Sequence, residues 1–481
     1  MRSNTNGELR LSDVGKTVTL TGWVAKKRDL GGLIFIDLRD RYGITQLVIN
    51  PKDECYNVAL NVKNEYCVKA TGKVIERSNK NLNIPTGEIE IEVSEFKIFS
   101  QSLQPPLLIQ DNTDALDDTR MRYRYLDLRR PVMQNNLLLR HKTCMSVRNY
   151  LDDLNFIEVE TPMLGKSTPE GARDFLVPSR VYPGSFYALP QSPQLYKQLL
   201  MVSGMDRYFQ IVKCFRDEDL RADRQLEFTQ IDLEMSFVDE IDVQNVTEGM
   251  LKRIWKDILN IEIQTPFVRM SWDDAMNFYG SDKPDTRFEM LLQDISSIAK
   301  KIDFGVFQNV LNESGVVKAI VAKGCADKYS RKEIDRLTLL AKKYHASGLA
   351  WLKMQDELSG SILKFLSKEN IDELKKELKL ENNDLVLIVS DKLDNANTAL
   401  GALRLTIAHE QNIIDESKFN FLWVVDWPLF EFSEEENRWV AAHHPFTSPK
   451  DGDEDKMLDH PEFTKAKAYD IVLNGYELGG G

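Results

Sequence analysis

The stretch from Phe215 to Phe237 restricts the possible folds of this chain more than any other part of it. It reads FRDEDLRADRQLEFTQIDLEMSF. Apolar residues alternate over Tyr208–Phe215, and again over Phe228–Phe237, which is typical of two β-strands. The residues between these strands are almost all polar, and they include three arginines. The sequence therefore predicts a hairpin whose long charged loop is available for binding rather than for packing.

The loop carries residue types that suit a nucleotide. Arg216, Arg221 and Arg224 offer forked, permanently charged donors that match phosphate oxygens. Phe228, where the chain enters the second strand, offers a flat face on which a base can stack. The alternative is a solvated loop whose charges only pair with one another.

Length, cysteine usage and the N-terminus restrict the class of protein. A chain of 481 residues is too long for one core, so we expect several domains. It has no apolar run of about eighteen residues that would span a membrane, and its first residues lack the apolar segment of a secretion signal. Its five cysteines form no CxxC pair, which favours reduced thiols in a cytoplasmic protein over disulfides or a zinc site.

The charge is distributed unevenly along the chain. The net charge is −13, which argues against a protein that coats nucleic acid in general. Residues 1–104 carry a net charge of +2 and the remainder carries −15. A nearly neutral first domain on an acidic body favours a local RNA contact.

The first hundred residues alternate as short strands do. The predicted strands are Thr17–Val24, Leu33–Asp40, Ile44–Asn50, Tyr66–Glu76 and Glu88–Phe99, with a helix near Glu54–Asn64. Five strands with one helix after the third match an OB-fold barrel, whose outer face binds single-stranded nucleic acid. A barrel that is merely structural is the alternative.

One strand of this barrel indicates where a base could stack. If Ile34 and Ile36 fill the barrel, Phe35 between them faces outward and is free to stack on a base. Polar residues near it in sequence would complete a stacking and hydrogen-bonding patch, and they are Arg28, Gln46, Arg77, Asn81 and Asn83.

Two segments before the hairpin suggest ligand contacts. Ser167–Asp174 is a polar loop with Gly171 as a hinge, able to close over a small ligand. Gln191–Lys197 begins a helix, and its residues Gln194 and Lys197 share one face because they lie three positions apart. The alternative for Lys197 is an ordinary surface lysine.

Two segments near the end of the chain add charged groups. His443 and His444 follow a strand, and they could be a metal pair or simply polar residues near a loop. Asp470 and Glu477 lie seven residues apart, so they would face opposite ways on one regular strand. A bulge or bend at Asn474-Gly475 is needed for both to hold one magnesium ion.

These segments, in this order, resemble the class II aminoacyl-tRNA synthetases, and the bacterial type of aspartyl-tRNA synthetase most closely. Phe215–Phe237 resembles motif 2. The predicted helix Gln134–Leu154, followed by Phe156–Pro162, resembles motif 1, which forms the dimer interface in that family. The resemblance covers essentially the whole chain and implies a homodimer that has no contact with a membrane.

The resemblance also implies an α+β multidomain fold: an N-terminal OB-fold β-barrel, an incomplete class II catalytic domain built on an antiparallel sheet, and an inserted α/β domain. We expect an anticodon-binding barrel over 1–104, a hinge over 105–130, the first part of the catalytic domain over 131–285, the inserted domain over 286–420 and the second part over 421–481. The inserted domain combines helices and strands, and its predicted elements are Val317–Ala322, Arg331–Tyr344, Glu369–Leu378 and Leu385–Val389. A buried strand is predicted over Phe421–Phe430.

By the same resemblance, the protein ligates L-aspartate to the 3′ end of tRNA(Asp), with ATP as substrate, through an aspartyl-adenylate. The aspartate would contact Glu170, Gln194, Lys197, Arg216, Asp232 and His443, and Arg216 would be catalytic by spanning the α-phosphate and the reacting carboxylate. The ATP would contact Arg216, Asp217, Glu218, Gln225, Phe228 and Glu477. Asp470 and Glu477 would hold Mg²⁺. The anticodon would contact the barrel patch of Arg28, Phe35, Gln46, Arg77, Asn81 and Asn83.

The end of the chain departs from the family pattern. In the family, an arginine for the substrate's side-chain carboxylate follows the triple glycine, and motif 3 comes further on, but this sequence stops at Gly481. We therefore expect a synthetase that is truncated before motif 3 and has impaired activity. The alternatives are a truncated paralogue that only binds tRNA, and a relative that charges asparagine or does not discriminate between the two tRNAs.

Overall fold

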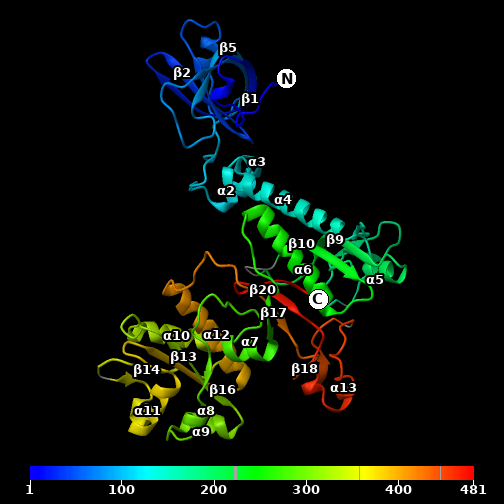
Figure 1. The fold of residues 1–481 in the computed structure, drawn as a ribbon, viewed down its shortest axis with the longest axis vertical. Coiled ribbons are helices and arrows are strands. Elements are labelled where there is room, and N and C mark those ends of the chain that lie inside the picture. Colours follow the sequence, from blue (N-terminus) through cyan, green and yellow to red (C-terminus); the bar gives the residue numbers. More distant parts are fainter. Residues whose placement is uncertain (169, 221–224, 357, 445) are drawn as a thin grey trace. The chain divides into compact units, whose positions relative to one another are not determined.

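The chain forms two compact units, Met1–Met145 and Ser146–Gly481 (Figure 1). The structure is a computed structural model, and it describes residues 1–168, 170–220, 225–356, 358–444 and 446–481. Among these residues, none of the helices has the length and apolar character that crossing a membrane requires.

The first unit begins with a closed five-stranded barrel, which confirms the predicted OB-fold architecture. Its strands lie in the order β1-β2-β3-β5-β4. Their bounds are β1 Thr17–Leu30, β2 Leu33–Asp40, β3 Gly43–Ile49, β4 Cys67–Glu76 and β5 Ile89–Ser100, and α1 (Tyr56–Leu60) follows β3. The predicted helix Glu54–Asn64 is too long, because the Asn61 N–H turns back to the Val58 carbonyl and ends α1.

Alternation along β2 places its side chains as predicted. Ile34 and Ile36 are completely buried in the barrel core, whereas Phe35 is half-buried on the outer surface. Phe35 pairs with Arg28 of β1 and with Val48 of β3. The outer face around Phe35 therefore spans three neighbouring strands.

The segment predicted as a hinge over 105–130 contains helical structure. It holds α2 (Asp117–Arg122) and α3 (Arg124–Asp127), and α4 (Pro131–Asp153) follows, close to the predicted helix Gln134–Leu154. Asp127 is completely buried and forms ion pairs with Arg120, Arg124 and Arg130. A buried charge cluster of this kind holds the segment in one conformation.

The second unit contains the predicted hairpin. The strands β9 (Arg207–Phe215) and β10 (Glu227–Met235) pair antiparallel, with Glu227 opposite Phe215 and Met235 opposite Arg207. β6 (Ile157–Glu158) lies parallel to β9 at the edge of this sheet. The surrounding elements are β7 Leu176–Pro178, β8 Phe186–Ala188, α5 Gln194–Val202 and α6 Glu240–Ile254.

A four-stranded sheet carries the end of the chain. It has the order β11-β17-β20-β21, with bounds β11 Val268–Ser271, β17 Phe421–Val425, β20 Asp470–Leu473 and β21 Tyr476–Gly480. The predicted strand Phe421–Phe430 is wrong in its second half, because Asp426 adopts a positive φ of 57° and Pro428 has no N–H. The chain then forms β18 (Phe430–Ser433), β19 (Arg438–Ala441) and α13 (Lys456–Asp459).

Between β11 and β17 lie α7 (Trp272–Tyr279) and the predicted inserted α/β domain. Its sheet has the order β12-β13-β16-β14-β15 (Figure 1). The strands are β12 Gln293–Asp294, β13 Val316–Ala322, β14 Ala350–Lys353, β15 Ser359–Gly360 and β16 Leu385–Asp391. The helices are α8 Ser296–Ala299, α9 Gly305–Asn312, α10 Arg331–Lys343, α11 Lys368–Glu377 and α12 Leu393–Glu410. Separate apolar cores pack against the two faces of this sheet.

Candidate functional site

A buried lysine and two carboxylates form the centre of the candidate site. Lys197, on α5, donates to the Oδ1 of Asp232 over 2.8 Å and lies 3.3 Å from the Oε2 of Glu234. Asp232 and Glu234 lie two positions apart on β10, so both side chains leave the same face of the strand. Burial disfavours the charged lysine, but the two carboxylates outweigh it, and the pKa of Lys197 is raised.

This centre has an excess of negative charge. Burial raises the pKa of Asp232. Lys197 offsets this increase only in part, and the charge of Glu170 adds to it. Among the described residues, the Oδ2 of Asp232 is buried and lacks a hydrogen-bond partner. A buried carboxylate oxygen without a donor is costly, and the ammonium group of an amino acid would supply that donor.

The polar loop Ser167–Asp174 is held beside this centre by two residues of the segment before α5. Gln191 is buried, donates to the carbonyl of Ala172 over 2.8 Å and to Asp174 over 2.6 Å, and accepts from the Ala172 N–H. Ser192 donates to the Oε2 of Glu170. Glu170 is therefore presented from the loop, as the sequence suggested, while Pro169 lies outside the described residues.

The same loop also contacts the beginning of the motif 2 loop. Arg173 and Asp217 form an isolated antiparallel bridge, in which the Asp217 N–H donates to the Arg173 carbonyl over 3.0 Å. Glu170 and Asp217 therefore lie on two segments that are joined by backbone hydrogen bonding.

Arg216 and Phe228 lie against each other at the end of the hairpin where the loop joins the two strands. The Arg216 guanidinium lies over the Phe228 ring, 5.1 Å from its centroid. In the described part of the chain, the Nε of Arg216 is buried without a hydrogen-bond partner. A buried guanidinium N–H without an acceptor is suited to an anion such as a phosphate or a carboxylate.

The charged groups described above act on one buried thiol, that of Cys214. It lies on β9 directly opposite Phe228. Burial raises the pKa of the Cys214 thiol to about 12, and the charges of Asp232, Arg216, Glu170 and Lys197 all act on it. Four of the predicted aspartate contacts, Glu170, Lys197, Arg216 and Asp232, are therefore near enough to this thiol to act on it.

Three more of the predicted ATP contacts lie in or near the loop between β9 and β10, whereas Glu477 lies on β21. Asp217 and Glu218 are half-buried at the end of β9, and Gln225 is exposed just before β10. Arg221 and Arg224, predicted as phosphate donors, lie outside the described residues. Gln194 is the first residue of α5 and lies one turn before Lys197, as predicted.

His443 follows β19 and packs against Trp427. Its Nε2 lies 3.1 Å from the carbonyl oxygen of Pro428, and its ring meets the Trp427 ring edge-on. Burial lowers the pKa of His443 below its usual value, although the Pro428 carbonyl and Glu431 oppose the shift. At neutral pH the free protein therefore favours a neutral imidazole here.

Asp470 and Glu477 lie on the two strands of one hairpin. Asn474 and Gly475 form the turn between β20 and β21, with φ of 54° and 86°. Glu477 pairs with Val472, and a register shift between Ile471 and Val472 follows. The predicted bend is thus a complete turn with a bulge beside it.

The carboxyl groups of this hairpin suit a divalent cation. The pKa of Asp470 is raised to about 7, chiefly by burial and also by the charges of Glu477 and Asp282, while Lys283 acts in the opposite direction. No group of three or more possible metal-ligating side chains occurs among the residues that the structure covers. Two carboxylates fit Mg²⁺, which takes its other ligands from water and from substrate phosphates.

On the barrel, the predicted anticodon contacts form a connected polar network. The Gln46 Oε1 accepts from Arg28 over 3.0 Å and from Arg77 over 2.8 Å, and Arg28 also donates to Asp37 over 2.6 Å. The Nε of Arg28 is buried and lacks a partner within the described residues. Gln46 itself is buried, so it orients the two arginines rather than lying open on the surface.

Asn81 and Asn83 lie in the loop between β4 and β5. Asn83 is exposed, and its N–H donates to the Asn81 side chain over 3.1 Å. The loop folds back so closely that a Cβ on Gly87 would lie 1.7 Å from the Asn81 carbonyl oxygen. Only glycine allows this approach.

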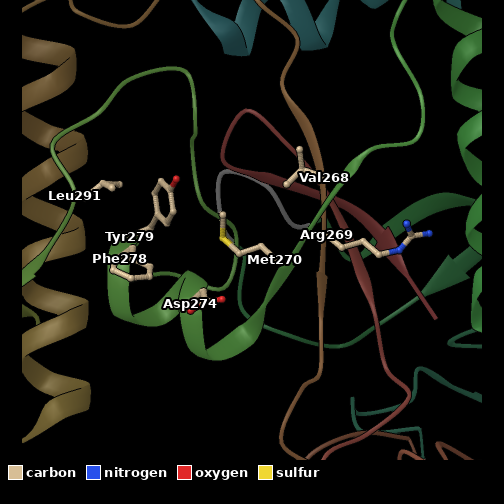
Figure 2. Close-up of a pocket in the computed structure, with 7 residues that line it drawn as sticks. All are labelled: Val268, Arg269, Met270, Asp274, Phe278, Tyr279 and Leu291. Atoms are coloured by element: carbon tan, nitrogen blue, oxygen red, sulfur yellow. The ribbon is translucent and has the colours of Figure 1, made fainter.

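A separate hollow lies on the second unit, away from all of these residues (Figure 2). It has a volume of about 300 Å³ and is lined by β11, α7 and Leu291. Its lining contains none of the predicted site residues.

Sequence reasoning missed Glu234, Gln191, Asp282 and Lys283. A signal existed for Glu234, because period-two alternation places it on the same face of β10 as Asp232. Gln191 is buried against a loop, while Asp282 and Lys283 act on Asp470 from a distant part of the chain. No local pattern in the sequence predicts that Gln191 contacts the loop or that Asp282 and Lys283 act on Asp470.

Comparisons with known proteins agree with this architecture. The family model for tRNA synthetases class II (D, K and N) matches residues 116–481, and the model for the OB-fold nucleic acid binding domain matches residues 18–99. Together with the closed barrel and the charged hairpin, these matches define a class II tRNA synthetase.

Two curated relatives narrow the class. The aspartate–tRNA ligases of Lactococcus lactis subsp. cremoris (strain SK11) and of Streptococcus agalactiae serotype Ia are each 58% identical to this chain, over 498 and 484 aligned residues. Each alignment covers 100% of this chain and 82% of the relative. The chain belongs to the aspartate–tRNA ligase family. The expected truncation receives no support from these matches and stays an expectation.

Solved structures share the fold at low sequence identity. Aspartyl-tRNA synthetase from Entamoeba histolytica matches with a TM-score of 0.53 at 18% identity, over 98% of this chain and 76% of that one. Asparaginyl-tRNA synthetase from Pyrococcus horikoshii, complexed with asparaginyl-adenylate, matches with a TM-score of 0.51 at 19% identity, over 82% of this chain and 93% of that one.

Proposed function

We propose that this protein ligates L-aspartate to the 3′ end of tRNA(Asp) in two steps, with an aspartyl-adenylate as the intermediate. The observation that carries the proposal is the buried Lys197–Asp232 pair, in which no donor of the described residues meets the Asp232 Oδ2 with hydrogen-bond geometry, although the Tyr208 hydroxyl lowers the pKa of this carboxyl. A site with one cation among several carboxylates suits a ligand that has an ammonium group and a carboxylate. Family membership supports the same conclusion.

Binding of aspartate follows from these charges. Lys197 has three N–H donors and uses two of them on Asp232 and Glu234, so a third remains for the side-chain carboxylate of the substrate. Asp232 and Glu170 accept from the substrate ammonium. Gln194 and a neutral His443 contribute hydrogen bonds at the rim of the site.

Activation needs no nucleophile from the protein, because the α-carboxylate of aspartate attacks the α-phosphorus of ATP and pyrophosphate leaves. Arg216 spans the attacking carboxylate and the α-phosphate, and its guanidinium, whose Nε is buried, holds the two in line. Phe228 stacks on the adenine, and Asp217, Glu218 and Gln225 orient it. A cation at Asp470 and Glu477 supplies charge neutralisation for the triphosphate.

The remaining proposals concern larger parts of the chain. Residues 1–104 bind the anticodon through Phe35, Arg28, Gln46, Arg77, Asn81 and Asn83. Residues 131–285 and 421–481 form the catalytic domain around the inserted domain 286–420, with 105–130 as the connection. A homodimer forms through α4 and the strand after it, as the motif 1 resemblance suggests.

Stable analogues of the intermediate test the amino-acid site without depending on turnover. We expect aspartyl-sulfamoyl-adenosine to bind at least about tenfold more tightly than asparaginyl-sulfamoyl-adenosine. Lys197 forms a stronger hydrogen bond with the charged carboxylate of the first analogue than with the neutral amide of the second. Isothermal titration calorimetry measures both dissociation constants. Lys197→Met should remove the preference, whereas Lys213→Met, at an exposed lysine of β9, should leave it intact. Equal affinities for the two analogues in the unmodified protein would contradict the proposal.

A further inference from the structure

Two buried cations of the inserted domain bind backbone carbonyl groups at its junction with the catalytic part of the chain. Arg404, on α12, is 1% exposed. Its Nη2 donates to the carbonyl oxygens of Asp285, Phe288 and Glu289 over 3.0, 2.8 and 2.9 Å, and its Nε donates to that of Met290 over 3.1 Å. Its guanidinium lies 3.8 Å from the centroid of the Phe288 ring.

Lys318, on β13, makes a similar contact at the end of α7. Its Nζ donates to the carbonyl of Asn277 over 2.8 Å and to the side chain of Asn397 over 2.6 Å. In the described part of the chain, the side chains of Lys318 and Arg404 hydrogen-bond to carbonyl and amide oxygens, while the carboxylates of Asp294 and Asp285 act on them only electrostatically. Burial of a cation without a closely paired carboxylate is costly, so contacts of this kind are poor candidates for stabilisation alone.

Close backbone contact holds the same junction together. α7 ends at Gly280, whose φ is 67°. A Cβ on Gly280 would lie 2.1 Å from the Asn397 carbonyl oxygen, and a Cβ on Gly401 would lie 2.6 Å from the Gly280 carbonyl oxygen. Both glycines therefore permit α7 and α12 to approach to a distance that any side chain would prevent.

The segment that Arg404 holds runs beside the hairpin that carries Asp470 and Glu477. A Cβ on Gly475, in the turn of that hairpin, would lie 3.3 Å from the Cβ of Asp285. Asn420 joins the two as well, because its side chain donates to the Thr286 carbonyl over 3.1 Å and its N–H donates to the Asn474 side chain over 2.9 Å. The segment thus fixes the position of the turn.

We propose that Arg404 of the inserted domain is a positioning residue for the Mg²⁺–ATP site, acting through the segment 280–290 and the Asn474–Gly475 turn. This inference rests on the proposed function. The inserted domain therefore contributes to ATP binding without contacting ATP.

The test compares Arg404→Met with a matched control, Asp384→Asn. Asp384 is also a buried polar residue of the inserted domain, and it accepts from Lys323 and from the Gly324 N–H. It precedes β16, whose first residue pairs with Ala322 at the end of β13, whereas Lys318 lies near the other end. Asp384→Asn therefore disturbs the inserted domain away from the junction.

We expect Arg404→Met to weaken the binding of Mg²⁺–ATP about 10- to 100-fold, as is typical when a residue supporting a metal site is lost, while aspartate affinity stays within about twofold. Asp384→Asn should change neither affinity. Calorimetric titrations measure both ligands, and hydrogen exchange of residues 471–478 in the metal-free protein should be faster only in Arg404→Met. If the methionine variant does not fold, Arg404→Lys replaces it, because lysine keeps the positive charge but lacks the several donors of the guanidinium. This variant should also weaken Mg²⁺–ATP binding without changing aspartate affinity, by a smaller factor than Arg404→Met.

Mg²⁺–ATP affinity within about twofold of the unmodified protein in both Arg404 variants would overturn the inference, as would an equal loss of aspartate affinity. These results differ from those expected if the proposed function is wrong. If it is wrong, the unmodified protein itself would bind no Mg²⁺–ATP.

Discussion

Single buried side chains with unsatisfied bonding capacity mark the candidate site. The Oδ2 of Asp232 and the Nε of Arg216 are both buried and unpartnered among the described residues. Folded proteins rarely keep such atoms, because each one costs about 1–3 kcal/mol. One is an acceptor and the other a donor, which matches a substrate that brings an ammonium group and an anion.

Replacement of Asp232 by Asn should separate binding from stability. We expect the affinity for aspartyl-sulfamoyl-adenosine to fall about 10- to 100-fold, because the hydrogen bond to the ammonium loses its charge. The free energy of unfolding should change by less than about 1 kcal/mol, since Glu234 still pairs with Lys197 and no buried charge is left alone. Calorimetry and urea denaturation measure the two quantities.

Glu227→Gln provides the control for this substitution. Glu227 lies on the same strand but is exposed and pairs with Lys213 over 2.6 Å. Neither affinity nor stability should change in this variant. An Asp232→Asn protein that binds the analogue as tightly as before would show that Asp232 is not an ammonium contact.

The β20–β21 hairpin is the element that we propose to hold the cation of the nucleotide. Its turn and bulge bring Asp470 and Glu477 from two strands to one place. The pKa of Asp470 is raised from its ordinary 3.8 to about 7, chiefly by burial and also by the charges of Glu477 and Asp282. The folded state therefore holds this proton more tightly than the unfolded state, so its contribution to stability is lost as the pH rises from 3.8 towards 7.

This titration should appear in metal binding. A cation competes with the proton on Asp470, so we expect the affinity for Mg²⁺–ATP to fall about tenfold per pH unit below pH 7 and to level off above it. Titrations between pH 5.5 and 8.5, about the range over which a group of this pKa changes charge, would measure the dependence. Asp470→Asn should bind weakly at every pH, with a flat profile. A flat profile in the unmodified protein would contradict the assignment of Asp470.

The whole molecule combines a nucleic-acid barrel with a synthetase core in one chain. The Arg28–Gln46–Arg77 network is organised before any ligand binds, since Gln46 orients both arginines. Burial raises the pKa of Asp37, although Arg28 and Arg77 oppose the shift. The barrel therefore presents an ordered polar surface around Phe35.

Removal of the Phe35 ring should weaken tRNA binding to the complete chain. We expect Phe35→Ala to reduce the affinity for tRNA(Asp) by about 1–3 kcal/mol, the usual value of one base stacked on an aromatic ring. Affinity for the adenylate analogue should not change. Filter binding with labelled tRNA measures the first quantity and calorimetry the second.

Phe99 offers a matched control on the same barrel. It is 43% exposed near the end of β5 and belongs to none of the predicted contacts. Phe99→Ala should leave tRNA affinity unchanged. Equal losses in the two variants would indicate a general effect on the barrel rather than stacking on Phe35.

Alternation of apolar and polar residues predicted much of the fold from the sequence. It identified the β9–β10 pair and all five barrel strands, because a period of two is a local property of a strand with one buried face. It also placed Phe35 outside the barrel. The order of the charged segments identified the family, and with it came the prediction that Lys197, Asp232 and Arg216 belong to one site. Of these, Lys197 and Asp232 are in direct contact.

Tertiary structure alone decided which of these residues meet and what lies around them. Glu234 shares Lys197 with Asp232, Gln191 holds the loop of Glu170, and Arg404 binds the segment beside Asp470 from more than a hundred residues away. The strand predicted over Phe421–Phe430 broke at Asp426. Local patterns predict whether a segment is a helix, a strand or a loop. Which side chains pair and which are buried depends on groups that only the folded chain brings together.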